Sequence, residues 1–146
     1  MTQTDNILIS VRHRHVLSML NGSKTVEVRR RPLRIQPGTR VWVYSKLPRG
    51  HVELVATVEK IAIGSPKDLW DSYRARIGIT FAEFSSYLSG VSAACAILLK
   101  DIEPLDPALE LSSLRRTSRN FHPPQFFTRF AHASTLHNLL ASKLPV

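Results

Sequence analysis

The sequence contains a single cysteine, Cys95, and no hydrophobic run long enough to cross a bilayer. One cysteine excludes an internal disulfide bond and a zinc site built from several cysteines. A membrane-spanning helix needs about 20 consecutive apolar residues, and the polar N-terminal segment lacks the layout of a signal peptide. We therefore expect a cytoplasmic protein without a membrane partner, and a buried, unreactive Cys95 thiol inside the apolar segment 93–99.

Acidic residues are scarce at both ends of the chain, and none lies in residues 111–146, which hold 5 Lys and Arg. Residues 1–60 hold 11 Lys and Arg against 4 Asp and Glu, whereas residues 61–110 hold 4 against 7. The three balances, +7, −3 and +5 in chain order, give the formal net charge of +9. Two basic regions around an acidic middle favour a polyanionic partner, most simply nucleic acid, over a merely solubilising surface.

Motifs of several common active sites are also missing. The chain has no glycine-rich phosphate loop, no serine-nucleophile elbow and no recognisable pair of catalytic carboxylates. His13 and His15 have no third ligand nearby, and His132 and His137 are spaced poorly for one face of a helix. We therefore expect neither a metal site nor a cofactor.

The segment from Asn21 to Pro32 carries the strongest functional signal. It joins a glycine to a strand-like stretch that holds one carboxylate and several cations. Alternate side chains of a strand point to opposite faces, so Val26, Val28 and Arg30 would share one face. The other face would carry Thr25, Glu27, Arg29 and Arg31. This second face suits an anionic ligand better than it suits core packing.

The spacing Gly-x-Lys-x-x-Glu-x-Arg, formed by Gly22, Lys24, Glu27 and Arg29, resembles the signature of the ASCH domain family, a branch of the PUA-like superfamily. A strand-like and a helix-like segment precede it, and a Pro-Gly turn and a further strand follow, as in that family. The likeness runs from about residue 7 to about residue 102 and is strongest before residue 46. It implies an α+β fold, a small PUA-like mixed β-barrel with inserted and C-terminal helices.

The hydrophobic patterns predict one domain over residues 1–146, with a core over about 7–102 and a basic C-terminal extension over 103–146. We expect strands over 7–12, 24–30, 41–44, 52–63 and 92–102, and helices over 14–21, after Ser65, after Thr80 and over 134–143. Ser65 and Thr80 fit the N-cap position. Pro104 and Pro107 are expected to break the chain after the last strand, and the rings of Phe126, Phe127 and Phe130 to be buried.

The family resemblance and the charge pattern together define the candidate ligand-binding residues. Lys24, Arg29 and Arg31 would hold phosphate or a polar base edge, and Glu27 would accept from a base N–H or fix Lys24. The mouth of the cleft would carry Ser10, Arg12 and Lys46. Tyr44 would either stack on a base or belong to the core.

Three functions remain open on the sequence alone. The leading one is an RNA-binding or nucleotide-binding module. The alternative is a small ASCH-type enzyme with Lys24 and Glu27 catalytic, either a ribonuclease or an amidohydrolase acting on acetylcytidine. The amidohydrolase pattern has a threonine where Glu27 stands, and this departure disfavours that activity. The third is a protein-binding transcription accessory module that uses the acidic helical middle, residues 68–83. The oligomeric state stays open.

Overall fold

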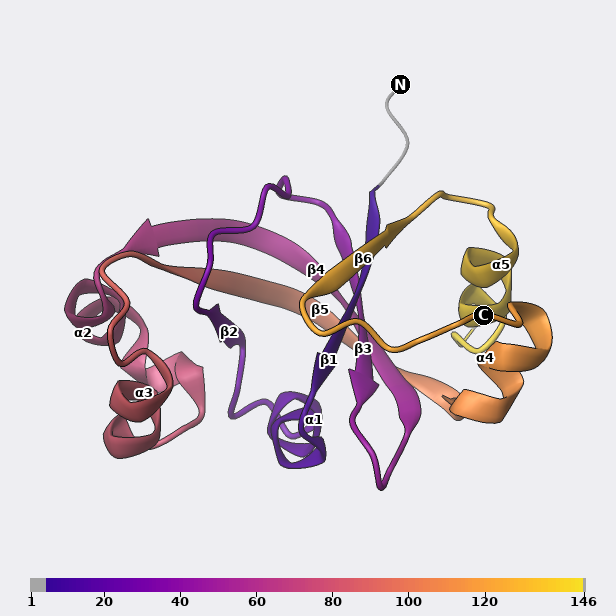
Figure 1. Cartoon of the computed structure of the whole chain (residues 1–146), viewed down its shortest axis with the longest axis horizontal. Coiled ribbons are helices and arrows are strands. Elements are labelled where there is room, and N and C mark those ends of the chain that lie inside the picture. Colours follow the sequence, from indigo (N-terminus) through magenta and orange to yellow (C-terminus); the bar gives the residue numbers. More distant parts are fainter. Residues whose placement is uncertain (1–4, 146) are drawn as a thin grey trace.

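Six strands form one mixed sheet that curves into a half-barrel in the computed structural model, which describes residues 5–145 (Figure 1). Their order across the sheet is β2-β5-β4-β3-β1-β6. Only β1 and β3 pair in parallel, and the other neighbours are antiparallel. The strands are β1 (Asn6–Val11), β2 (Val26–Arg29), β3 (Arg40–Ser45), β4 (His51–Gly64), β5 (Ala94–Glu110) and β6 (Phe127–Phe130). The predicted α+β fold is confirmed.

Five helices in the described chain lie at three places around the sheet: α1 (His13–Leu20), α2 (Pro66–Ile77), α3 (Phe81–Tyr87), α4 (Leu111–Thr117) and α5 (Thr135–Ala141). α2 and α3 lie together at one end of the sheet and α4 and α5 at the other, with α1 between them (Figure 1). Both predicted N-caps are confirmed. Ser65 accepts from the Asp68 amide, and Thr80 forms a complete capping box with Glu83.

The core is built from the alternation of the strands. Ile7, Ile9 and Val43 point to one face, where Val16 and Met19 of α1 cover them. On the opposite face, buried strand residues pack against the C-terminal helices, forming a second cluster that includes Leu8, Trp42, Tyr44, Leu114 and Leu140. Val26 and Val28 pack in a third cluster against α2 and α3. Cys95 is buried as predicted, and burial raises the pKa of its thiol.

Two predictions about the second half of the chain are wrong. β5 does not end near residue 102 but runs through Pro104 and Pro107 to Glu110. β2 pairs with residues 95–98, so the later part of β5 has one edge without a strand partner. Proline has no N–H group to donate, and it is tolerated at such an edge because no neighbouring strand needs that hydrogen bond. A short strand, β6, joins the free edge of β1, and the side chain of Phe126 before it is 54% exposed rather than buried.

Candidate functional site

A pocket of about 620 Å³ opens between α1, α3 and the edge strand β2. Among residues 5–145, β2 has no strand neighbour other than β5, and the C-terminal end of β1 faces it across the opening. The turn after α1 places Lys24 at this opening, because the Lys24 amide donates to the Ser18 carbonyl at 3.0 Å. Gly22 permits the turn with φ of +86°, a left-handed conformation that glycine adopts without steric cost.

Three charged side chains form the floor of the pocket. Lys24 is 2% exposed and Glu27 is 7% exposed. The Lys24 Nζ atom donates to the Ile77 carbonyl at 2.8 Å and lies 3.5 Å from Glu27 Oε1. The other carboxylate oxygen, Oε2, lies 3.0 Å from the Arg29 guanidinium, which also donates to the Ser10 carbonyl at 3.2 Å. The cluster therefore ties β2 to both β1 and the end of α2.

The charges of the floor set the protonation states around it. Burial raises the pKa of Glu27, but the neighbouring Arg29 and Lys24 cations outweigh burial, so the net shift is downward. Glu27 is therefore ionised at neutral pH. Burial, followed by the Lys24 charge, lowers the pKa of His15 on α1, so this imidazole is neutral there. The floor combines a fixed carboxylate, two cations and a neutral imidazole.

Two polar atoms at the pocket have no hydrogen-bond partner within residues 5–145. They are the hydroxyl oxygen of Ser10 and the Nε atom of Arg29. Ser10 is 5% exposed, so water reaches this hydroxyl poorly. Buried polar groups are normally paired, and an unpaired one carries a free-energy cost that a ligand can remove. Both atoms are therefore available to a group bound on the floor.

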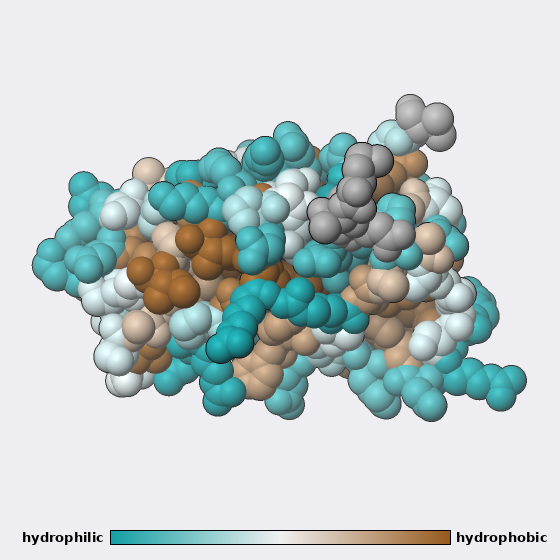
Figure 2. Space-filling view, turned by 90° about the horizontal axis from the view of Figure 1, so that it is seen from above, coloured by the Kyte–Doolittle hydropathy of each residue, from teal (hydrophilic) through white to brown (hydrophobic). Residues whose placement is uncertain are grey.

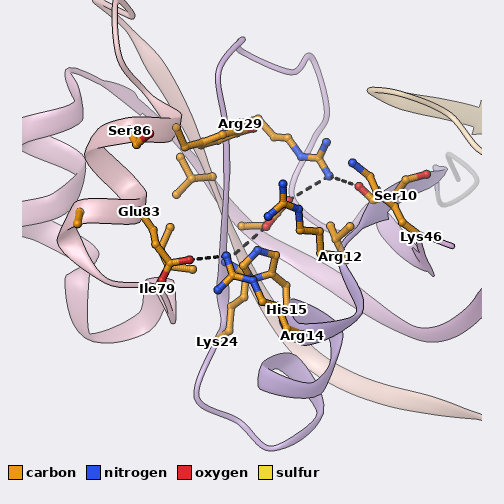
Figure 3. Close-up of a pocket in the computed structure, with 15 residues that line it drawn as sticks. Ser10, Arg12, Arg14, His15, Lys24, Arg29, Lys46, Ile79, Glu83 and Ser86 are labelled. Atoms are coloured by element: carbon orange, nitrogen blue, oxygen red, sulfur yellow. Dashed lines mark hydrogen bonds and ion pairs between the residues drawn. The ribbon is translucent and has the colours of Figure 1, made fainter. Parts of the chain in front are cut away.

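An ion pair spans the pocket between its two helices. Glu83 of α3 points towards Arg14 of α1, whose guanidinium donates to the Glu83 carboxylate (Figure 3). This hydrogen bond, together with those from Thr80, lowers the pKa of Glu83 to about 2. Arg12 and Lys46 also line the pocket and are exposed. Exposed cations therefore lie at the mouth, whereas the paired charges lie on the floor.

Most of the residues predicted for ligand binding meet at this pocket. Those that line it are Ser10, Arg12, Lys24, Glu27, Arg29 and Lys46. Arg31 does not, since β2 ends at Arg29 and strand alternation no longer applies beyond it. Its guanidinium lies over the Phe126 ring instead, 5.0 Å from the ring centroid. Tyr44 of β3 is 1% exposed and belongs to the core, so of the two roles left open for its ring the structure favours the core position over stacking on a base.

The remaining pocket residues were not predicted from the sequence. Arg14 and His15 directly follow the predicted Arg12, and their place on the first turn of α1 could have suggested them. Ile79, Glu83 and Tyr87 come from α3 and the turn before it, at least 50 residues after the signature. Only the packing of α3 beside β2 brings them to the pocket, and no local pattern shows this.

Neither a metal centre nor a membrane span is evident in the described chain. No group of three or more His, Cys, Asp or Glu side chains within residues 5–145 is placed to hold a metal ion. None of the helices described is long and apolar enough to span a membrane.

Comparison with known proteins places this arrangement in a family. A family profile described as "Domain of unknown function (DUF365)" matches residues 6–128. A protein of Zymomonas mobilis named "ASCH domain-containing ribonuclease" is 33% identical over 111 residues, which cover 76% of this chain and 74% of that protein. The chain belongs to this family and is an ASCH domain.

Solved structures agree with the fold of the ASCH domain. The crystal structure of ASCH from Zymomonas mobilis superposes with a TM-score of 0.88 at 28% identity and covers 96% of each chain. The structure of a variant of the same protein gives a TM-score of 0.89 and covers 99% of this chain and all of that one. The predicted membership of the ASCH family is thus confirmed, and the structural likeness covers nearly the whole chain.

Proposed function

We propose that this ASCH domain binds RNA and takes one nucleotide of the strand into its pocket. The observation that carries the proposal is the buried cluster of Lys24, Glu27 and Arg29 on the floor of a pocket of about 620 Å³. Small-molecule pockets span roughly 300–1,000 Å³, so this volume suits a nucleotide better than a duplex. The formal charge of +9 supports attraction to a polyanion.

Binding of a single-stranded RNA oligomer, followed by fluorescence anisotropy at increasing salt, tests this proposal. The slope of log affinity against log salt should be negative, by roughly 0.7 for each phosphate contact. Binding that is absent or independent of salt would overturn the proposal.

Two tryptophan substitutions on α3 test whether the pocket is the site. Ala82 lines the pocket, so Ala82→Trp should fill it and weaken binding by about tenfold or more, a loss of at least roughly 1.4 kcal/mol. Ser85 is exposed on the same helix and does not line the pocket. Ser85→Trp is the matched control and should bind as the wild type does. Equal affinities for the two variants would place RNA elsewhere on the surface.

A second candidate function is cleavage of the bound RNA, which the name of the Zymomonas mobilis relative favours. The low pKa of Glu27 makes it a weak base, whereas neutral His15 can accept a proton. In this proposal the RNA 2′-oxygen attacks the adjacent phosphorus as His15 takes its proton. The 5′-oxygen then leaves with a proton from Lys24. The products are a cyclic phosphate and a free 5′-hydroxyl.

Lys24→Arg separates binding from cleavage. Arginine keeps the positive charge but does not release a proton at ordinary pH. RNA affinity should stay within about tenfold, roughly 1.4 kcal/mol, while cleavage measured by gel electrophoresis is lost. Thermal unfolding of the same preparation checks that the variant is folded. Cleavage by folded Lys24→Arg at the wild-type rate would exclude Lys24 as the proton donor. A wild-type protein that binds RNA without cutting it would leave binding as the whole function.

A further inference from the structure

The floor of the pocket presents hydrogen-bonding groups of alternating kind. Glu27 is an acceptor, with Lys24 beside one of its oxygens and Arg29 beside the other. An ionised carboxylate accepts about four hydrogen bonds, so the two cations leave room for a ligand donor. An ammonium group has three donors, and the Ile77 carbonyl and Glu27 engage two of those of Lys24. The floor therefore offers a ligand a donor, an acceptor and a second donor.

Unpaired atoms strengthen the donor end next to Arg29. The Nε atom of Arg29 and the hydroxyl of Ser10 are both without a partner in the described chain, and the Arg29 guanidinium reaches the Ser10 backbone. In Figure 3 Arg29 and Ser10 lie on one side of the pocket and Lys24 on another. Both cations form ion pairs with Glu27. A ligand acceptor at this end would satisfy groups that are otherwise buried and unpaired.

The same arrangement disfavours a phosphate on the floor. The negative charge of a phosphate there would repel the ionised Glu27 carboxylate. An ionised phosphate also carries no hydrogen that it could donate to this carboxylate. The exposed cations Arg12 and Lys46 at the mouth have no such carboxylate bonded to them within residues 5–145 and suit a phosphate better. A bound nucleotide should thus place its base on the floor and its phosphate at the mouth.

Uracil is the base whose edge matches this floor. Its edge presents an acceptor, O4, a donor, N3–H, and a second acceptor, O2. Cytosine would place the lone pair of N3 against the Glu27 carboxylate. Two hydrogen-bond acceptors would then face each other in a buried site, and this lowers affinity. We propose that the pocket selects uracil, with Glu27 accepting from N3–H and with Lys24 and Arg29 donating to the two carbonyl oxygens. This inference rests on the proposed nucleotide binding and is an alternative to the cleavage step above, since Lys24 cannot both hold a uracil oxygen and give a proton to the leaving 5′-oxygen.

Calorimetric titration with uridine and cytidine monophosphates tests the selection directly. Uridine monophosphate should bind at least about tenfold tighter, since one mismatched buried group commonly costs that much. On the wild-type protein, 3-methyluridine monophosphate lacks the N3 donor and should bind as weakly as the cytidine nucleotide. The 5-methyluridine nucleotide keeps the whole edge and should bind like uridine. Equal binding of the uridine and cytidine nucleotides would overturn the base assignment and leave nucleotide binding intact. Binding of neither would overturn the proposed function itself.

A pair of isosteric variants assigns the selection to one carboxylate. Glu27→Gln replaces the acceptor by an amide that can also donate to N3 of cytosine, so the preference for uracil should fall to within about threefold. Glu103→Gln removes a carboxylate that pairs with Arg40 outside the pocket and should keep the preference. A preference that survives in Glu27→Gln would overturn the role of Glu27. If Glu27→Gln does not fold, the methylated nucleotides on the wild-type protein decide the question.

Discussion

The two basic regions of this ASCH domain hold their cations in different ways. At the pocket, Lys24 and Arg29 are largely withdrawn from water and share one carboxylate. In the C-terminal region, Arg115 and Arg116 are exposed, and they donate to the nearby Phe121 carbonyl and Ser113 hydroxyl. Burying a charge is costly unless it is paired and hydrogen-bonded, whereas an exposed charge stays hydrated. The net charge of a region thus indicates attraction to a polyanion. Buried and paired charges indicate where a ligand would be bound specifically.

The exposed hydrophobic residues are also unevenly distributed over the surface. Seen from above, hydrophobic residues gather over the end of the sheet that carries α2 (Figure 2). Ile63 near the end of β4 is 58% exposed. This surface lies apart from the charged floor, whose side chains line the pocket between α1 and α3.

The largest expected difference between the two regions is at Glu27. Glu27→Leu would leave Lys24 and Arg29 as buried cations without their carboxylate, and removing one partner of a buried pair costs about 3–5 kcal/mol. Urea unfolding should show a loss of this size. The control, Arg116→Ala in the C-terminal region, should change stability by no more than about 0.5 kcal/mol. A loss below about 1 kcal/mol in Glu27→Leu would mean that water already solvates the floor.

Two glycines differ in how closely their surroundings pack, and only one of them adjoins the pocket cluster. Gly78 and Gly90 both have positive φ, +71° and +78°. A Cβ atom on Gly78 would lie 2.7 Å from the Lys24 Cβ, whereas nothing lies within 4 Å of one on Gly90. Both alanine variants should lose about 1 kcal/mol from backbone strain. Gly78→Ala should lose a further 1–2 kcal/mol, on the scale of an overpacked core, and should weaken RNA binding as well. Equal losses in the two variants would mean that Lys24 shifts freely.

Local signals predicted the pocket strand well. The signature spacing and the alternation of Val26 and Glu27 depend on neighbours within a few residues, and the structure keeps both. The same parity argument fails at Arg31 because β2 stops two residues earlier. Strand length depends on pairing with β5, which the sequence of β2 alone does not specify.

Longer-range features escaped prediction for a related reason. β5 tolerates Pro104 only because β2 is short and leaves that edge free. Tyr44 shares a face with Trp42, and the choice between the two roles left open for it depended on α4 and α5 covering that face. Such outcomes depend on which elements meet, and composition or spacing does not contain that information.

A smaller effect is expected from pH, which should change the stability that Glu27 contributes. The folded-state pKa of Glu27 lies below its ordinary value of 4.5, because Arg29 and Lys24 outweigh burial. The stability that this ionised carboxylate contributes is therefore fully present above pH 4.5 and is lost as pH falls through the lower folded-state value. The stability difference between the wild type and Glu27→Gln should shrink below pH 4.5. An unchanged difference down to pH 2 would mean that Glu27 is not held ionised by its neighbours.

The smallest expected effect belongs to the exposed arginines, and it should appear in salt dependence rather than in recognition. Replacing Arg115, Arg116 and Arg119 by glutamine removes three exposed cations that are not bound in the pocket cluster. Each lost phosphate contact should reduce the salt slope of single-stranded RNA binding by roughly 0.7, while the preference for uridine over cytidine nucleotides stays the same. Stability should change by no more than about 0.5 kcal/mol per substitution. If the preference for uridine nucleotides fell together with the salt slope, the C-terminal region would contribute to base recognition. Base recognition would then not be confined to the pocket cluster.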